Sequence, residues 1–260
     1  MERRALTALA VLLLLPGCTQ PGSSAQPELD SKPTEKPVSL FHAPENLEQL
    51  TVKLREASYV IECGESLGSG FGYSTHSGEQ RYDFIITTKT VVADCLNSKT
   101  DPVIRDRDSN AFSAEVMASS KTSGGTAENF AVNEDFAILK PATAKFATFD
   151  SDADSYQIGS WVMTGSFPGL NADHFTWTAA HGILSSNLHN LGYAISTPTH
   201  PGSNGGVVIN AKGQVVGLRY TPTNKSLEGI SYILQIDQAA PLLNEVTEQL
   251  AELEVEPRLG

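Results

Sequence analysis

The segment Pro201-Gly202-Ser203-Asn204-Gly205-Gly206 lies between two short β-type runs, Tyr193–Thr197 and Gly206–Asn210. Similar runs, bounded by Gly, Ser, Asn or Asp, continue on both sides, as expected for short antiparallel strands. In this half of the chain the others are Ser160–Thr164, Phe175–Leu184, Gln214–Tyr220 and Ile230–Ile236. Towards the N-terminus they are Tyr59–Cys63, Phe71–Ser74, Tyr82–Thr88, Pro102–Arg105, Phe112–Met117 and Asp135–Lys140. Two sets of six strands predict two antiparallel β-barrels.

Helical patterns flank the strands. A short helix is expected within residues 45–57, where leucines recur at spacings of three and four: Leu47, Leu50 and Leu54. A closing helix is expected at about 237–253, with Asp237 as N-cap and Pro241 in the first turn. The segment Ser119–Asn133 lacks periodicity and predicts a long exposed loop. The predicted fold class is all-β, with a first barrel at about 58–145 and a second at about 155–236.

The N-terminus indicates export. Arg3 and Arg4 precede an apolar run, Ala5–Leu15, that is too short for a permanent membrane-spanning helix. The run ends in Leu15-Pro16-Gly17-Cys18, which resembles a bacterial lipobox. We therefore expect residues 1–17 to be a lipoprotein signal peptide and Cys18 to carry the lipid. The alternative is an ordinary signal peptide followed by an incidental cysteine.

Composition adds an expected location. Residues 18–44 combine five prolines with Ser, Gln, Glu and Lys, which predicts a disordered tether. The net charge of −12 argues against nucleic acid and anionic membrane surfaces as partners. We expect the lipid alone to hold the protein to a bacterial membrane, with the domain in the cell envelope outside the cytoplasm.

Two cysteines remain once Cys18 is assigned to the lipid. Cys63 and Cys95 form an even pair in an oxidising compartment, which predicts a disulfide. Closing the loop between them would stabilise the fold by about 3–4 kcal/mol in the chain-entropy model. The alternative is a pair of unpaired buried thiols.

Four motifs occur in one order along the chain. They are Gly68-Ser69-Gly70-Phe71, Ile85–Ala93 (IITTKTVVA), Asp135–Lys140 (DFAILK) and Pro201–Gly206 (PGSNGG). Together they resemble trypsin-like serine peptidases of the HtrA type, whose pattern reads GSGF, LTNAHVV, DLAVLK and PGNSGGP. The His, Asp and Ser of the last three motifs form the catalytic triad of that family. The resemblance covers roughly residues 45–250 and implies the double barrel.

The resemblance places Thr90 at the histidine position, Asp135 at the carboxylate position and Asn204 at the serine position. The family's chemistry needs a hydroxyl to attack, an imidazole to take its proton and a carboxylate to orient the imidazole. Thr90 is no base near neutral pH, and the amide of Asn204 offers no nucleophile. The oxyanion-type backbone N–H groups of Gly202 and Asn204 do not depend on side chains, so a pocket for a peptide carbonyl or carboxylate would persist.

Three other assignments would restore a catalytic group. A one-residue slip would make Ser203 the nucleophile, but Gly202 and the pair Gly205-Gly206 fix the register against it. In digestive trypsin-like enzymes the catalytic histidine directly precedes a cysteine. The residue directly before Cys95 is Asp94, so this alignment gives no histidine either. The string Thr178–His181 (TAAH) resembles their histidine motif but follows Asp135 in the chain.

The resulting hypothesis is a lipid-anchored pseudoprotease that binds a protein or peptide, uses no cofactor and contacts no nucleic acid. The histidines show no spacing typical of a metal site, so none is expected. His200 is a candidate for lining the groove because it lies just before Asn204. Two alternatives stay open: a serine endopeptidase that uses Ser203, and a purely structural envelope lipoprotein.

Overall fold

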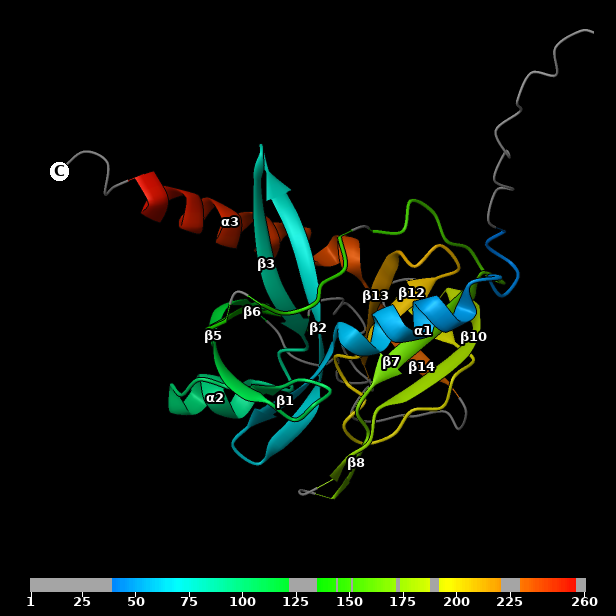
Figure 1. Cartoon of the computed structure of the whole chain (residues 1–260), viewed down its shortest axis with the longest axis horizontal. Coiled ribbons are helices and arrows are strands. Elements are labelled where there is room, and N and C mark those ends of the chain that lie inside the picture. The colour runs from blue at the N-terminus through cyan, green and yellow to red at the C-terminus, as the bar shows by residue number, and fades with distance from the viewer. Residues whose placement is uncertain are drawn as a thin grey trace, which may run out of the picture. The chain divides into compact units, whose positions relative to one another are not determined.

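The computed structural model describes residues 39–121, 135–143, 145–150, 152–171, 174–187, 192–220 and 230–255. Their strands form two closed six-stranded antiparallel barrels (Figure 1). The predicted all-β double barrel is therefore confirmed. The predicted signal peptide, Cys18 and nearly all of the predicted tether lie outside the described residues, as does most of the loop predicted at 119–133.

The first barrel has the strand order β1-β2-β3-β6-β5-β4. Its strands are β1 (Ser58–Cys63), β2 (Ser66–Ser77), β3 (Gln80–Thr87), β4 (Val103–Arg105), β5 (Ala111–Ser119) and β6 (Ala137–Pro141). β2 and β3 form a long hairpin that is prominent in Figure 1. A short helix, α2 (Ala93–Ser98), follows the turn after β3.

The second barrel has the order β10-β11-β14-β13-β12-β7. Its strands are β7 (Trp161–Ser166), β10 (Thr178–Asn187), β11 (Tyr193–Ile195), β12 (Val207–Asn210), β13 (Val215–Tyr220) and β14 (Ser231–Gln235). Between β7 and β10 lies a separate small hairpin of β8 (Gly169–Asn171) and β9 (His174–Phe175). The continuous strand predicted at Phe175–Leu184 is thus two strands, β9 and β10.

The alternation of side chains along each strand produces three cores, because successive residues face opposite sides of a sheet. Ile85 belongs to the core inside the first barrel, and Val162 to the core inside the second. Their neighbours Ile86 and Met163 point the other way, into a third and larger core that draws on both barrels. The two barrels therefore share apolar packing.

Helices cover this shared core. α1 (Leu47–Glu56) lies across β7 in Figure 1, and its Leu50 and Leu54 are buried in the shared core. The closing segment is a 3-10 turn, η2 (Ile236–Ala239), that continues into α3 (Ala240–Val255), with Pro241 in the first turn. The predicted N-cap was wrong, because Asp237 lies inside η2 and Gln235 is the residue that precedes it. Among the described helices, none has both the length and the apolar character needed to cross a membrane.

The chain reaches the second barrel before α1 begins. The backbone carbonyl of Leu40 accepts a hydrogen bond of 2.7 Å from the N–H of Trp161, the first residue of β7. Leu40 belongs to the segment whose composition predicts a tether, so the last residues of that segment contact the domain.

Candidate functional site

Thr90 and Asp135 are in direct contact. Thr90 lies in the turn between β3 and α2, and Asp135 lies just before β6, which pairs with β3. The backbone N–H of Thr90 donates to Oδ1 of Asp135 at 2.9 Å, and its Oγ1 donates to Oδ2, also at 2.9 Å. Both carboxylate oxygens therefore have a donor from one residue, at the position where the family pattern has histidine.

Asp135 is a buried carboxylate, with 4% of its surface exposed. Burial raises its pKa above the ordinary 3.8, because a charge loses hydration in the interior. The bonds from Thr90 and the cation of Lys89 oppose this rise. Lys89 is itself held by the backbone carbonyls of Ser120 and Lys121, at 2.7 and 3.0 Å from Nζ.

Asn204 lies in a loop that is bent by two tight turns. The N–H of Ser203 donates to the carbonyl of His200 at 3.0 Å, and that of Gly206 donates to the carbonyl of Ser203 at 3.1 Å. Gly202 and Gly205 have φ of +84° and +83°, which is the left-handed region that favours glycine. The two glycines therefore set the shape of this loop.

The first barrel contacts this loop through Ser69 of β2. The Ser69 N–H donates to the carbonyl of Asn204, and its Oγ donates to the carbonyl of Gly202, both at 2.8 Å. A Cβ on Gly205 would lie 2.0 Å from the Ser69 carbonyl oxygen and 2.4 Å from Oγ1 of Thr87. The GSGF motif and the end of β3 thus lie directly against the loop, which brings the sequence motifs into one region.

Within the described part of the chain, two backbone donors of the loop have no acceptor. Its N–H groups at Ser203, Gly205 and Gly206 have backbone acceptors. Those of Gly202 and Asn204 have no acceptor among the described residues. Backbone N–H groups without internal partners are available to a carbonyl or carboxylate oxygen.

Ser203 is not presented for attack on a substrate. It is 1% exposed, and its Oγ has no hydrogen-bond partner among the described residues. Asn204, the next residue, is half-buried. The turns at Gly202 and Gly205 therefore leave Asn204 more exposed than Ser203.

Asp94 and His181, the residues that the other two alignments place at the histidine position, have partners other than Asp135. Asp94 is on α2, where its Oδ2 accepts a hydrogen bond of 2.8 Å from Ser66. His181 is exposed on β10, and its ring stacks on Trp161 with the centroids 6.0 Å apart. His200 is exposed and contributes its backbone carbonyl to the loop.

Cys63 and Cys95 form the predicted disulfide, with their Cα atoms 5.4 Å apart. It joins the end of β1 to α2, the helix that follows the Thr90 turn. Both cysteines pack in the core of the first barrel with Val91 and Val92. The disulfide therefore fixes the segment that carries Thr90.

Arg219 was missed by the sequence reasoning. It is 4% exposed on β13, a strand whose residues are all buried. Its backbone carbonyl accepts from Gly205 N–H and its own N–H donates to the Gly206 carbonyl, both at 2.8 Å. The available signal was a single charged residue within the apolar run at 215–220, where an unpaired charge is costly.

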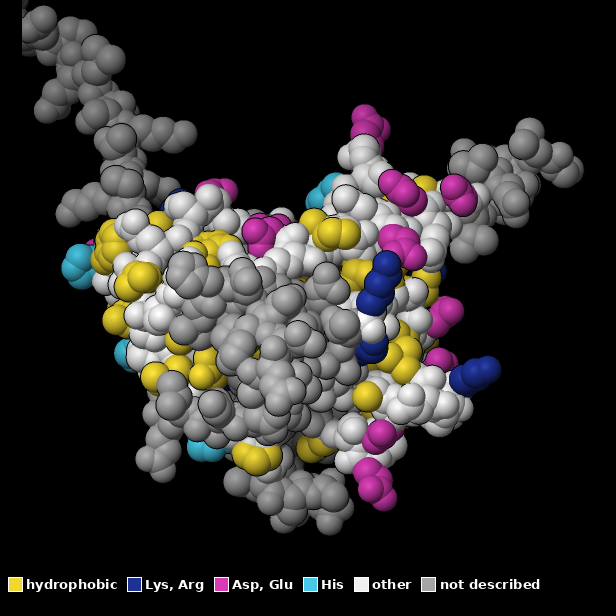
Figure 2. All heavy atoms as spheres, turned by 180° about the vertical axis from the view of Figure 1, so that it is seen from behind, with side chains coloured by type: hydrophobic (Ala, Val, Ile, Leu, Met, Phe, Trp, Pro, Cys, Tyr) yellow, Lys and Arg dark blue, Asp and Glu magenta, His cyan; other side chains and the backbone are white. Residues whose placement is uncertain are grey.

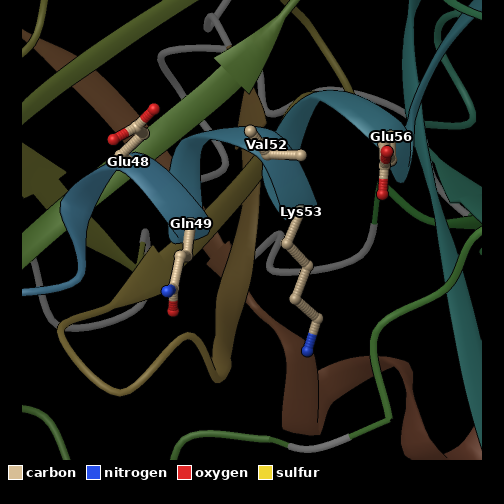
Figure 3. Close-up of a pocket in the computed structure, with 5 residues that line it drawn as sticks. All are labelled: Glu48, Gln49, Val52, Lys53 and Glu56. Atoms are coloured by element: carbon tan, nitrogen blue, oxygen red, sulfur yellow. The ribbon is translucent and has the colours of Figure 1, made fainter.

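A surface depression on α1 lies outside the four motifs. A depression of about 500 Å³ on α1 is lined by Glu48, Gln49, Val52, Lys53 and Glu56. In Figure 3 these side chains do not converge on one point, and none belongs to the four motifs. Among the described residues, no group of three His, Cys, Asp or Glu side chains could hold a metal ion. On the face seen in Figure 2, acidic side chains outnumber basic ones, in line with the net charge.

Comparison with known proteins identifies the family. Residues 68–218 match the model of the trypsin-like peptidase domain. Probable periplasmic serine endoproteases described as DegP-like are similar to this chain. The protein from Pseudomonas putida is 26% identical over 192 residues, which is 70% of this chain and 35% of the relative. The protein from Hahella chejuensis is 26% identical over 193 residues, covering 70% and 36%. The chain thus spans about a third of the length of these relatives.

A solved structure agrees on the fold. The serine endoprotease from Yersinia pestis superposes with a TM-score of 0.57 at 19% identity, covering 79% of this chain and 68% of that one. The family model covers more than half of the chain, and both barrels have the expected six strands. The chain therefore belongs to the trypsin-like peptidase family, with an HtrA-type peptidase domain.

Proposed function

We propose that this protein is a catalytically inactive, lipid-anchored member of the trypsin-like peptidase family that binds a peptide segment of another protein. The observation that carries the proposal is the bidentate contact between Thr90 and Asp135. In an active triad the carboxylate orients an imidazole. Here both of its oxygens accept hydrogen bonds from a residue that cannot act as a base.

The loop supports the loss of the nucleophile. Asn204 holds an amide where the family pattern has serine, and the hydroxyl beside it, on Ser203, is buried. Losing members of a triad costs on the order of 10⁶ in turnover, since they act as a unit. Peptide hydrolysis at the rate of an active peptidase is therefore not expected.

The same loop supports binding. The N–H groups of Gly202 and Asn204 are without acceptors among the described residues, so they suit an oxygen of a bound peptide. Neither donor requires a side chain, which explains how binding persists when the catalytic residues are replaced.

An extracytoplasmic location fits the relatives, which are described as periplasmic. Lipid attachment at Cys18 rests on the N-terminal sequence. Cys18→Ser should abolish incorporation of radiolabelled fatty acid and release the protein from membranes without unfolding it. Incorporation that persists in this variant would refute the assignment.

Rebuilding the triad tests the proposal of inactivity. The wild type, Thr90→His and Asn204→Ser should release no fluorescent fragments from labelled casein above background. The double variant should gain activity, since an imidazole and a hydroxyl would join Asp135. Hydrolysis by the wild type would contradict the proposal.

A further inference from the structure

A buried cation that has no acidic partner among the described residues lies next to the Asn204 loop. The guanidinium of Arg219 lies among neutral groups: its Nη2 donates to Oγ of Ser231 at 2.8 Å and to the carbonyl of Pro198. Its Nη1 makes longer contacts of 3.5 and 3.4 Å with the hydroxyls of Thr164 and Ser166. Its Nε has no partner among the described residues.

The guanidinium keeps its charge in this environment. Burial lowers the pKa of Arg219 to about 10, which leaves it protonated at neutral pH. Among the described residues, no carboxylate lies within 4.0 Å of it. Buried charges are normally paired, because an unpaired ion loses its hydration and gains nothing in return.

Other arginines of the chain show the contrast. Arg105 on β4 pairs with Glu62 through two bonds, from Nε at 2.6 Å and from Nη2 at 3.2 Å. Arg107 contacts both Glu56 and Asp108. These arginines are more exposed than Arg219 and yet have acidic partners, so the lack of one at Arg219 within the described parts of the chain calls for an explanation.

The position of Arg219 supplies that explanation. Its backbone holds Gly205 and Gly206, and its Nη2 binds the carbonyl of Pro198, which precedes the loop. Arg219 therefore contacts both ends of this segment, through its backbone at Gly205 and Gly206 and through its guanidinium at Pro198. Between them lie the N–H groups of Gly202 and Asn204, which have no acceptor among the described residues. A peptide held by those N–H groups would have its neighbouring groups close to this cation.

We propose that Arg219 makes the binding site selective for a peptide that carries a carboxylate, either an acidic side chain or a free C-terminus. This inference rests on the proposed peptide-binding function and adds its substrate class. Guanidinium groups bind carboxylates through charge-assisted hydrogen bonds. Nη2 of Arg219 is engaged by Ser231 and Pro198, so Nε or Nη1 is the donor that a carboxylate would take. The hydroxyls of Thr164 and Ser166 are weakly held alternatives that a carboxylate would replace.

Three tetrapeptides test the inference on the purified protein by isothermal titration calorimetry. Each has an acetylated N-terminus and three alanines. The first ends in glutamate amide, the second in glutamine with a free carboxylate, and the third in glutamine amide. The first two each carry one carboxylate and the third carries none, so the comparison also separates an acidic side chain from a chain terminus.

At least one carboxylate peptide should bind on the order of 10- to 100-fold more tightly than the neutral one, as expected for a hydrogen-bonded charge pair. Arg219→Met should bind all three equally, and its Tm should be unchanged or higher, because no acidic partner is lost. Arg105→Met is the matched control, which removes one positive charge elsewhere and should keep the preference.

Equal binding of the three peptides by the wild type would overturn the selectivity but leave peptide binding intact. Failure of all three to bind would contradict both. The comparison on the wild type needs no variant, so it decides the matter even if Arg219→Met does not fold.

Discussion

The two barrels each bury one charge next to the site, and they treat it differently. In the first barrel, Asp135 receives hydrogen bonds on both carboxylate oxygens from Thr90. In the second barrel, Arg219 finds only neutral acceptors, and its Nε has none among the described residues. One buried charge is satisfied within its own barrel, while the other has only neutral partners among the described residues.

The two buried charges therefore have different roles at the site. An active triad requires a carboxylate that is engaged with an imidazole. Here the carboxylate has become a structural acceptor that fixes the Thr90 turn. Among the described residues, the guanidinium keeps unused hydrogen-bonding capacity beside that of the Gly202 and Asn204 N–H groups, and this is the basis of the proposed recognition of a carboxylate.

The largest effect on stability is expected at Gly205, where the Asn204 loop of the second barrel packs against Ser69 of the first barrel. In Gly205→Ala, the new Cβ would lie 2.0 Å from the carbonyl oxygen of Ser69, at a residue with φ of +83°. Strain and overpacking together should lower the free energy of unfolding by about 2–5 kcal/mol. Urea denaturation measures this change.

Gly78→Ala is the matched control for Gly205→Ala. Its φ is +61°, but a Cβ there would meet nothing within 4 Å. Only the backbone strain of about 1–2 kcal/mol should remain. Equal losses in the two variants would show that the loop does not pack tightly against β2.

Removing the disulfide should destabilise the first barrel around Asp135 more than the second barrel around Arg219. The double variant Cys63→Ser/Cys95→Ser opens a loop with a sequence separation of 32 and should lose about 2–4 kcal/mol. Hydrogen exchange should accelerate at Val91 and Val92 and change little in β13. Faster exchange confined to β13 would contradict the disulfide's role in holding the Thr90 turn.

Thr90→Val tests how far the bidentate contact satisfies Asp135. Valine keeps the shape and the backbone N–H but removes the Oγ1 donor, which leaves Oδ2 buried without it. Stability should fall by about 1.5–3 kcal/mol, as for a hydrogen bond to a charged group. Thr90→Ser retains the hydroxyl and should lose clearly less. A valine variant as stable as the wild type would show that the contact contributes nothing.

A smaller effect is expected in the pH dependence of stability. Because the folded-state pKa of Asp135 is raised, the unfolded chain ionises first as the pH rises above the ordinary value of 3.8. The wild type should therefore lose stability relative to Asp135→Asn between that pH and the folded-state pKa. Thermal unfolding of both proteins between acidic and neutral pH checks the sign. If the wild type instead becomes more stable relative to Asp135→Asn as the pH rises, the folded-state pKa of Asp135 is lowered.

Much of the fold follows from periodicity and turn residues, but local packing decides the rest. Every strand of the two barrels falls within or overlaps a run predicted from sequence. α2 was missed because its six residues are too few to show a helical period. β2 extends beyond its predicted core at 71–74, because its glycines allow close approach: a Cβ on Gly68 would lie 2.3 Å from the Val91 side chain.

The site was predictable in its identities but not in its contacts. The motifs placed Thr90, Asp135 and Asn204 at the three triad positions, and the identities of Thr90 and Asn204 predict that the triad of the family is incomplete. The groups that satisfy Asp135, and the neutral partners that Arg219 has among the described residues, come from parts of the chain that are far apart in sequence. These properties come from pairing β3 with β6 and from the docking of the loop on Ser69, which no local pattern encodes.

The central claim is tested most directly by a fluorophosphonate probe, which labels activated serines. The purified wild type should show no labelling, because position 204 carries an amide and Ser203 is buried. Labelling of the wild type that Ser203→Ala abolishes would contradict the account and establish Ser203 as a nucleophile.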